Sequence, residues 1–121
     1  MDHFQIQIEE GSTGICILRV LGALTLQNVF EFQNTARSET SRAIVVDLTD
    51  VPYMDSVGLG SILGVFASCQ RTSRGFALAG ASSRVRTLLE VAKADRILLL
   101  SDTVGAAEAQ LFARERNGHN V

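Results

Sequence analysis

One serine, Ser56, lies in a segment whose residues could do chemistry, Met54-Asp55-Ser56-Val57-Gly58-Leu59-Gly60. A serine at a turn between a strand and a helix can be a nucleophile when it stands in the pattern G-x-S-x-G and has a histidine base. Met54 takes the place of the first glycine, and the histidines, His3 and His119, lie near opposite ends of the chain. The segment therefore argues against hydrolase chemistry, and we expect no catalytic residue.

The glycines of this region raise the question of phosphate binding. Gly58, Gly60 and Gly64 cluster where a helix is expected to begin, and backbone N–H groups at a helix start attract anions. A dinucleotide fingerprint would need glycine at Leu63, and no G-K-[ST] ending of a P-loop follows. A nucleotide contact outside these motifs stays open, but we expect no cofactor.

Three aspartates near the same loop could form an acidic pocket for Mg²⁺ or a phosphoacceptor site: Asp47, Asp50 and Asp55. Aspartates in loops more often cap helices or face solvent. We therefore expect no metal site here.

Two interpretations of Ser56 remain open from the residues alone. Serine is a favoured N-cap, a role that contributes about 1 kcal/mol and needs no partner. An exposed hydroxyl at a helix start can equally accept a phosphate from a kinase, which adds about −1.5 to −2 charge. The two roles are compatible.

The helix after Ser56 carries a stripe of small side chains away from its apolar face, formed by Val57, Ser61, Gly64 and Ser68. Glycine inside a helix costs about 1 kcal/mol relative to alanine, so Gly64 suggests that something packs closely there. A protein partner and another helix of the same domain are both open as the occupant.

The first half of the chain predicts the elements that lead to this loop. Residues 4–8 alternate apolar and polar side chains and should form a half-buried strand, joined by a turn at 11–14 to a deeper strand at 15–21. Thr25 is the expected N-cap of a helix that runs to about Ser38. This helix should face the core with Leu26, Val29, Phe32 and Ala36. Residues 43–48 have the β-branched pattern of a central parallel strand.

The second half alternates helices and strands. An apolar stripe predicts a helix that ends before Gly75, and the stripe consists of Leu59, Ile62, Leu63, Phe66 and Cys69. Strands are expected at 76–79 and 97–100, with Ser82 or Ser83 capping the helix between them and Asp102 or Thr103 capping a final helix. The order predicts an α/β fold, in which about four helices pack on a mixed sheet made of an N-terminal antiparallel hairpin and parallel strands. The loop from Asp50 to Ser56 would then lie at the carboxyl ends of the parallel strands, where sites gather.

Composition excludes several classes of function. The 121 residues, 46% hydrophobic and 20% charged, suit one domain over residues 1–121, with a core at about 3–115 and a polar end at 116–121. The formal charge of −2, without a basic stripe, argues against nucleic-acid partners. The chain shows neither a membrane-spanning run nor a signal peptide, so we expect no membrane insertion and a cytoplasmic location. Cys16 and Cys69 form no C-x-x-C pair and should be reduced core residues.

Residues 45–60, VVDLTDVPYMDSVGLG, resemble the signature of STAS domains, named for sulphate transporters and anti-sigma factor antagonists. Gly22-Ala23-Leu24 and residues 85–97 extend the resemblance, which spans roughly residues 3 to 115. Without transporter helices, the chain resembles the bacterial anti-sigma factor antagonists in particular. In these proteins the unphosphorylated form binds an anti-sigma factor and frees the sigma factor.

The resemblance implies partners and site residues. The anti-sigma factor is typically also a serine kinase of the histidine-kinase-like ATPase fold, and a phosphoserine phosphatase reverses the modification. By resemblance, Ser56 is the phosphorylated residue, and phosphate beside Asp55 should repel the partner. The expected partner-binding residues are Thr25, Asp55, Ser56, Val57, Gly58, Gly60, Ser61, Gly64 and Ser68.

Two departures limit the resemblance. Thr25 stands where many relatives have aspartate, which weakens inference about polar contacts to the kinase or its nucleotide. Val57 replaces a second hydroxyl, so Ser56 is the only hydroxyl of the core motif, with Thr49 a less favoured second site. The alternative function is a scaffold subunit of a stressosome-like assembly or a soluble accessory subunit of a membrane transport complex. Homo-oligomerisation is left open.

Overall fold

Five strands form one mixed sheet in sequence order in the computed structural model, which describes residues 3–12 and 14–116. The strands are β1 (Gln5–Glu10), β2 (Ile15–Leu21), β3 (Ala43–Asp50), β4 (Gly75–Ala79) and β5 (Leu100–Ser101). β1 and β2 pair antiparallel as a hairpin, and every later neighbour is parallel. The helices are α1 (Val29–Ser38), α2 (Ser56–Arg71), α3 (Ser83–Val91) and α4 (Val104–Arg116), with a short 3-10 helix at Ala94–Arg96. The predicted fold class is confirmed.

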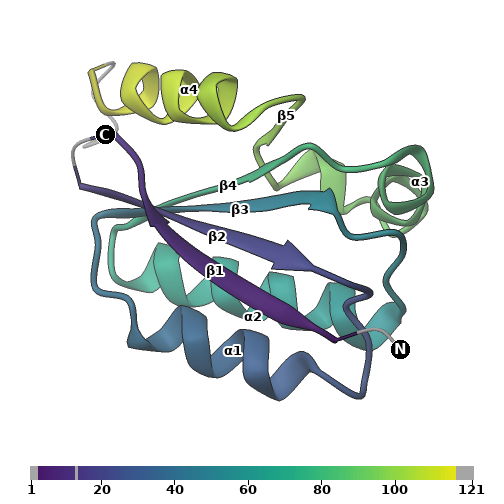
Figure 1. Cartoon of the computed structure of the whole chain (residues 1–121). Helices are drawn as coiled ribbons and strands as arrows, with labels where there is room; N and C mark the ends of the chain where they lie inside the picture. The colour runs from purple at the N-terminus through teal and green to yellow at the C-terminus, as the bar shows by residue number, and fades with distance from the viewer. Residues whose placement is uncertain (1–2, 13, 117–121) are drawn as a thin grey trace.

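The central strand β3 is apolar on both sides because both faces of the sheet are covered. Ile44, Val46 and Leu48 point to the larger core, which α1, α2 and α3 close. Ala43 and Val45 point to a smaller core under α4. Figure 1 shows α1 and α2 side by side below the sheet and α4 above it. Consecutive side chains of a strand face opposite ways, so a continuous apolar run suits this position.

The larger core contains most of the buried apolar side chains. Phe32, Leu24 and Ile62 are fully inaccessible within it. The smaller core is rich in alanine, with Ala77 and Ala107 both at 0% exposure, which lets α4 lie close to the strands. Both cysteines are free and buried, and burial raises the pKa of the Cys16 thiol to about 12. The prediction that they are core residues is confirmed.

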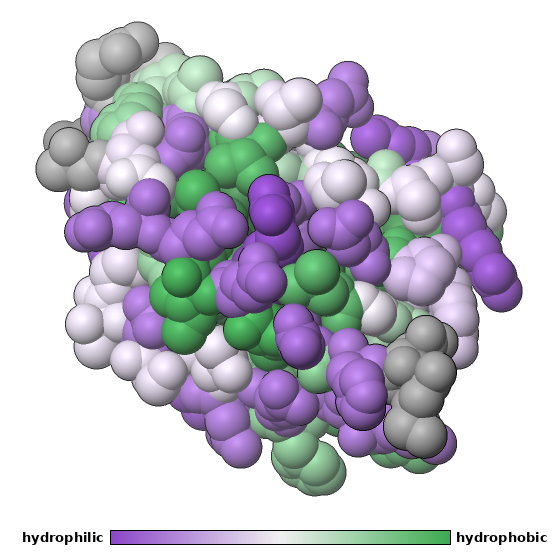
Figure 2. Space-filling model, in the orientation of Figure 1, coloured by the Kyte–Doolittle hydropathy of each residue, from purple (hydrophilic) through white to green (hydrophobic). Residues whose placement is uncertain are grey.

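The free edge of β1 is more exposed than its alternating pattern predicts. Ile6 packs against the core, but Ile8 is 52% exposed. Glu9 and Glu10 place charge on this edge, which discourages pairing with another strand. Figure 2 shows hydrophilic side chains over most of the front face, with hydrophobic groups between them.

The predicted start of the first helix is wrong. α1 begins at Val29, with Asn28 at the N-cap position, and Leu26 is 64% exposed instead of facing the core. The side chain of Asn28 accepts a hydrogen bond from Thr25 N (2.8 Å) and donates one to Ala23 O (2.7 Å). These two bonds hold residues 23–28 in a turn before the helix, because asparagine readily satisfies nearby backbone groups outside a helix.

The last strand is shorter than predicted. Lys93 adopts a left-handed conformation (φ 62°) and leads into the 3-10 helix, so the chain turns where the apolar run 97–100 predicts an extended strand. Ile97 is 58% exposed, and of that run only Leu100 belongs to β5, although Leu99 O also accepts a hydrogen bond from Leu78 N of β4 (2.9 Å). Apolar content alone does not distinguish a strand from a buried turn.

Both later caps agree with the prediction. Ser82 Oγ accepts a hydrogen bond from Val85 N (3.2 Å), and Thr103 Oγ1 accepts one from Ala106 N (3.1 Å). Of the predicted polar end, residues 117–121 lie outside the described residues. Among the helices of the described residues, none is long and apolar enough to cross a membrane.

Candidate functional site

The loop between β3 and α2 delivers Ser56 to the carboxyl end of the sheet. β3 is buried to Leu48, Val51 and Met54 anchor the loop in the core, and Ser56 is the first residue of α2. Val51 N donates a hydrogen bond to Leu48 O (3.0 Å), which turns the chain out of the strand. The loop is therefore held at both ends and presents Ser56 at a defined place.

Asp55, not Ser56, is the N-cap of α2. Its Oδ1 accepts a hydrogen bond from Gly58 N (2.7 Å), and its Oδ2 accepts one from Leu26 N (3.1 Å). Hydrogen bonding to the backbone N–H of Gly58, with a further contribution from that of Leu26, lowers the pKa of this carboxyl below its ordinary value. The carboxylate thus joins the start of α2 to the turn before α1. Of the two interpretations of Ser56, the helix cap is therefore wrong, and capping does not occupy the Ser56 hydroxyl.

The segment around Leu24 follows the loop in parallel. Gly22 N donates to Asp50 O (3.1 Å), Leu24 N donates to Tyr53 O (3.2 Å), and Asp55 N donates to Leu24 O (3.3 Å). Leu24 itself is fully buried. Residues 22–26 and 50–55 therefore form one backbone unit, although they are about 30 positions apart in the sequence.

Gly58 permits this close approach. A Cβ atom at position 58 would lie 2.1 Å from Leu24 O and 2.9 Å from Leu24 C, whereas a Cβ at Gly60 would meet nothing within 4 Å. Position 58 therefore requires glycine for packing, whereas position 60 has room for a larger side chain. The two glycines of the motif thus serve different ends.

Ser56 is exposed, and its hydroxyl makes no hydrogen bond to any of the residues that the structure describes. It lies at the positive end of the α2 dipole, where a negative charge is stabilised by about 0.3–1 kcal/mol. A free hydroxyl in this position is accessible to a modifying enzyme. The geometry suits a phosphoacceptor, and a phosphate there would stand next to the Asp55 carboxylate.

The small residues of α2 divide between the inside and the outside of the protein. Gly58 and Ser61 are buried, and Ser61 Oγ donates a hydrogen bond to Gly58 O (2.6 Å). Gly64 is exposed and lies beside Gln33 of α1, while Ser68 is half-buried. The neighbouring helix α1 is thus the element that packs against part of the small-residue stripe. Ser56, Val57, Gly60 and Gly64 are the expected partner-binding residues that stand open, whereas Thr25, Asp55 and Ser68 are half-buried.

Exposed apolar side chains lie on the segments that lead to the start of α2 and to the turn bonded to Asp55, and the sequence patterns did not identify all of them. Leu26 (64% exposed) sits on the turn bonded to Asp55, Phe30 (73%) lies in the first turn of α1, and Val57 (41%) follows Ser56. Tyr53 is also exposed, with the guanidinium of Arg84 4.9 Å above its ring. Phe30 falls off the predicted helical stripe, which was the available signal for it, whereas Leu26 was predicted to face the core. We call Leu26, Phe30, Tyr53, Ser56 and Val57 the Ser56 surface.

The three aspartates considered for a metal site have separate roles. Asp47 is buried, accepts a hydrogen bond from Thr49 Oγ1 (2.6 Å) and pairs with Arg19 (3.4 Å). Asp50 is exposed, and Asp55 caps α2. Among the described residues, no group of three His, Cys, Asp or Glu side chains could hold a metal ion. Thr49, the less favoured second site, has its hydroxyl engaged by Asp47.

Comparison with known proteins places this geometry in a family. The family model of the STAS domain matches residues 6–107. An anti-sigma-B factor antagonist of Listeria monocytogenes is 30% identical over 98% of this chain and 99% of its own length. The antagonist of the same name from Staphylococcus aureus is 31% identical over 59% of this chain and 66% of its own length.

Solved structures share the fold. An anti-sigma factor antagonist from Mycobacterium paratuberculosis has a TM-score of 0.76 at 18% identity, covering 90% of this chain and 94% of its own. SpoIIAA in its unphosphorylated form has a TM-score of 0.75 at 18% identity over 90% and 97% of the two chains. The phosphorylated form of SpoIIAA, a Bacillus cell fate determinant, gives 0.70 at 17% over 88% and 98%. With the family match over most of its length and a full-length antagonist at 30% identity, the chain belongs to the STAS domain family of anti-sigma factor antagonists.

Proposed function

We propose that this protein is a binding switch in which unphosphorylated Ser56 permits docking to an anti-sigma factor, which then releases its sigma factor. The observation that carries the proposal is the free, exposed hydroxyl of Ser56 within an exposed apolar surface, on a helix start already capped by Asp55. The relatives named as antagonists support the class of partner. The chain would act by binding and not by catalysis, in the cytoplasm.

The proposed modification is a phosphoryl transfer by the partner, acting as a serine kinase. Ser56 Oγ attacks the γ-phosphorus of ATP, the bond to the β–γ bridging oxygen breaks, and ADP leaves. The hydroxyl proton passes to a base of the kinase. A phosphatase would restore the hydroxyl by hydrolysis of the phosphate ester.

Phosphate at Ser56 should disfavour docking more than folding. In the free protein, the α2 dipole partly offsets its repulsion from Asp55, and water screens both charges. Two unit charges 4 Å apart in water interact by only about 1 kcal/mol. In a docked interface, Leu26, Phe30 and Val57 would exclude water, so the dianion would lose its hydration there.

Incubation with ATP and a serine kinase of the proposed partner class, followed by peptide mass spectrometry, tests the modification. We expect one phosphate at Ser56 and none on the Ser56→Ala variant. Thr49→Ala is the matched control and should be modified as the wild type is, because the Thr49 hydroxyl is held by Asp47. Phosphate at another residue with Ser56 untouched would contradict the proposal.

A further inference from the structure

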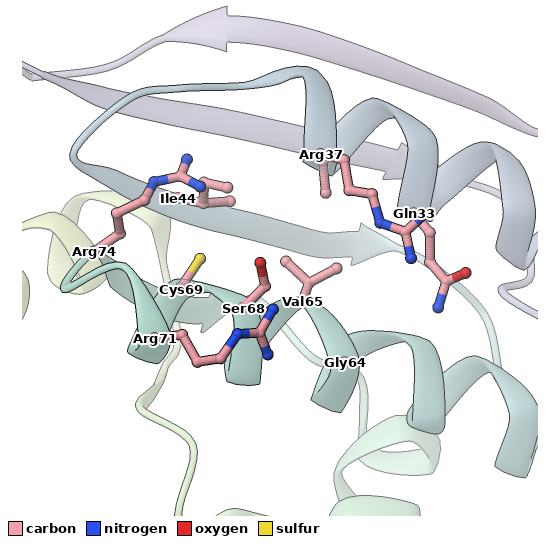
Figure 3. Close-up of a pocket in the computed structure, with 10 residues that line it drawn as sticks. Gln33, Arg37, Ile44, Gly64, Val65, Ser68, Cys69, Arg71 and Arg74 are labelled. Carbon is pink, nitrogen blue, oxygen red and sulfur yellow. The ribbon is translucent and has the colours of Figure 1, made fainter.

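A cleft between α1 and α2, away from Ser56, is lined by cationic side chains. Its volume is about 320 Å³. Arg37 extends into it from the end of α1 and Arg71 from the end of α2, while Arg74 follows just after α2. Figure 3 shows the side chain of Arg37 extending from α1 toward α2, with Arg71, Ser68 and Val65 on the α2 side of the gap. No carboxylate lines the cleft.

The arginines of the cleft differ in how they are held. Arg74 donates hydrogen bonds to Ser41 O (2.6 Å) and Glu39 O (3.0 Å), so its guanidinium is fixed by backbone carbonyls. Within the ranges 3–12 and 14–116, the side chains of Arg37 and Arg71 make no hydrogen bond and no ion pair. Three like charges that share a cleft without a carboxylate repel one another, and a bound anion would relieve that repulsion.

A simpler role for Arg37 and Arg71 is to offset the dipoles of their own helices, because each stands in a last helical turn. That role requires only that each charge stay near its own helix end. It does not require that both side chains enter one cleft, nor that the cleft stay open beside them. Gly64 keeps it open, because even an added Cβ there would have only the Gln33 amide nitrogen as a neighbour, at 3.8 Å.

The walls of the cleft define the ligand further. Its inner surface is apolar, with Ala36, Ile44, Val65 and Cys69 all buried. Its outer surface offers guanidinium, amide and hydroxyl donors. Guanidinium groups recognise phosphate well, because their planar array of N–H groups matches two phosphate oxygens. The volume lies at the lower end of the range for small-molecule sites, about 300–1,000 Å³.

We propose that this cleft binds a small organic phosphate, with the phosphate between Arg37 and Arg71 and an apolar body against Val65. Such a ligand would bridge the two helices, since one arginine belongs to each. The inference does not depend on phosphorylation of Ser56, which lies at the opposite end of α2.

Binding of phenyl phosphate, followed through backbone amide shifts in two-dimensional NMR, tests the proposal. We expect shifts at Gln33, Gly64 and Ser68, tighter binding than for inorganic phosphate, and no binding of uncharged benzyl alcohol at the same concentration. Arg37→Gln and Arg71→Gln should each weaken binding at least about fivefold, as loss of a charge-assisted hydrogen bond does. Both side chains are exposed, so both variants should fold.

Arg96→Gln is the matched control, because it removes the same charge from an exposed position outside the cleft. It should bind phenyl phosphate as the wild type does, as should Ser56→Ala. Equal weakening by all three arginine variants would show general anion attraction and overturn the proposal. Shifts confined to the start of α2, or no binding at about 10 mM, would overturn it as well.

Discussion

Replacement of Gly58 by alanine should separate the turn before α1 from the start of α2. The added Cβ would lie 2.1 Å from Leu24 O, which is backbone and cannot rotate away. The strand-like unit formed by residues 22–26 and 50–55 must therefore move by roughly 1 Å to restore an ordinary contact. That movement acts on two hydrogen bonds, Asp55 N to Leu24 O (3.3 Å) and Leu26 N to Asp55 Oδ2 (3.1 Å).

The expected cost follows from these bonds. A neutral hydrogen bond contributes about 0.5–1.5 kcal/mol, and one to a charged group about 1.5–3 kcal/mol. Alanine in place of helical glycine returns up to about 1 kcal/mol. Gly58→Ala should therefore lower the free energy of unfolding by about 1–3 kcal/mol. Gly60→Ala, where the Cβ meets nothing within 4 Å, should raise it by about 0.5–1 kcal/mol.

Urea denaturation of the two variants, followed by circular dichroism, measures this difference. Both substitutions add one methyl group to the same helix two positions apart, so helix propensity cancels in the comparison. If Gly58→Ala proved as stable as Gly60→Ala, the close approach of Leu24 to α2 would not constrain the fold, and our reason for this glycine would be wrong.

Three further substitutions test other parts of the structure. Asp55→Asn keeps an N-cap acceptor but cannot ionise. The pKa of Asp55 is lower in the folded state than in the unfolded state, so its ionised carboxylate stabilises the wild type above the ordinary carboxyl pKa. This stability is lost as the pH falls through the folded-state pKa. Urea titrations at pH 7, 4 and 3 should therefore show a steeper loss for the wild type than for Asp55→Asn, and parallel losses would contradict the cap geometry. Leu26→Gln should change the free energy of unfolding by less than about 0.5 kcal/mol, because Leu26 is exposed. The same substitution should weaken partner binding measured by calorimetry, and unchanged binding would show that Leu26 is not part of the Ser56 surface. Ala107→Leu should cost about 1–3 kcal/mol by overpacking the alanine-rich core under α4, and an unchanged melting temperature would count against that packing.

Much of the fold could be predicted because local pattern and burial agree. The apolar run of β3, the caps at Ser82 and Thr103 and the hairpin of β1 and β2 all follow from the sequence. The start of α1 could not, because Thr25 is as good a cap as Asn28 until the bond from Asn28 to Ala23 is known. The late start of β5 at Leu100, inside the apolar run 97–100, likewise could not be predicted, because it depends on the left-handed turn at Lys93.

The candidate site was located by its motif, but its internal arrangement depends on tertiary contacts. Asp55 and Ser56 are both good caps by residue type, and the bond from Gly58 N to Asp55 Oδ1 decides between them. The bond from Leu26 N to Asp55 Oδ2 is the tertiary contact that the sequence could not show. Gly58 and Gly60 look alike in the sequence, yet only Gly58 touches Leu24. No local pattern could bring Leu26 and Phe30 to the Ser56 surface, because they reach it from another part of the chain.

The affinity of the protein for its anti-sigma factor, before and after phosphorylation, tests the central claim most directly. Calorimetry should use the unmodified protein, the stoichiometrically phosphorylated protein and Ser56→Ala treated identically with kinase and ATP. We predict that phosphorylation weakens binding at least tenfold, about 1.4 kcal/mol, and that Ser56→Ala binds as tightly as the unmodified protein under both conditions. Equal affinity of the phosphorylated and unmodified proteins would contradict the switch.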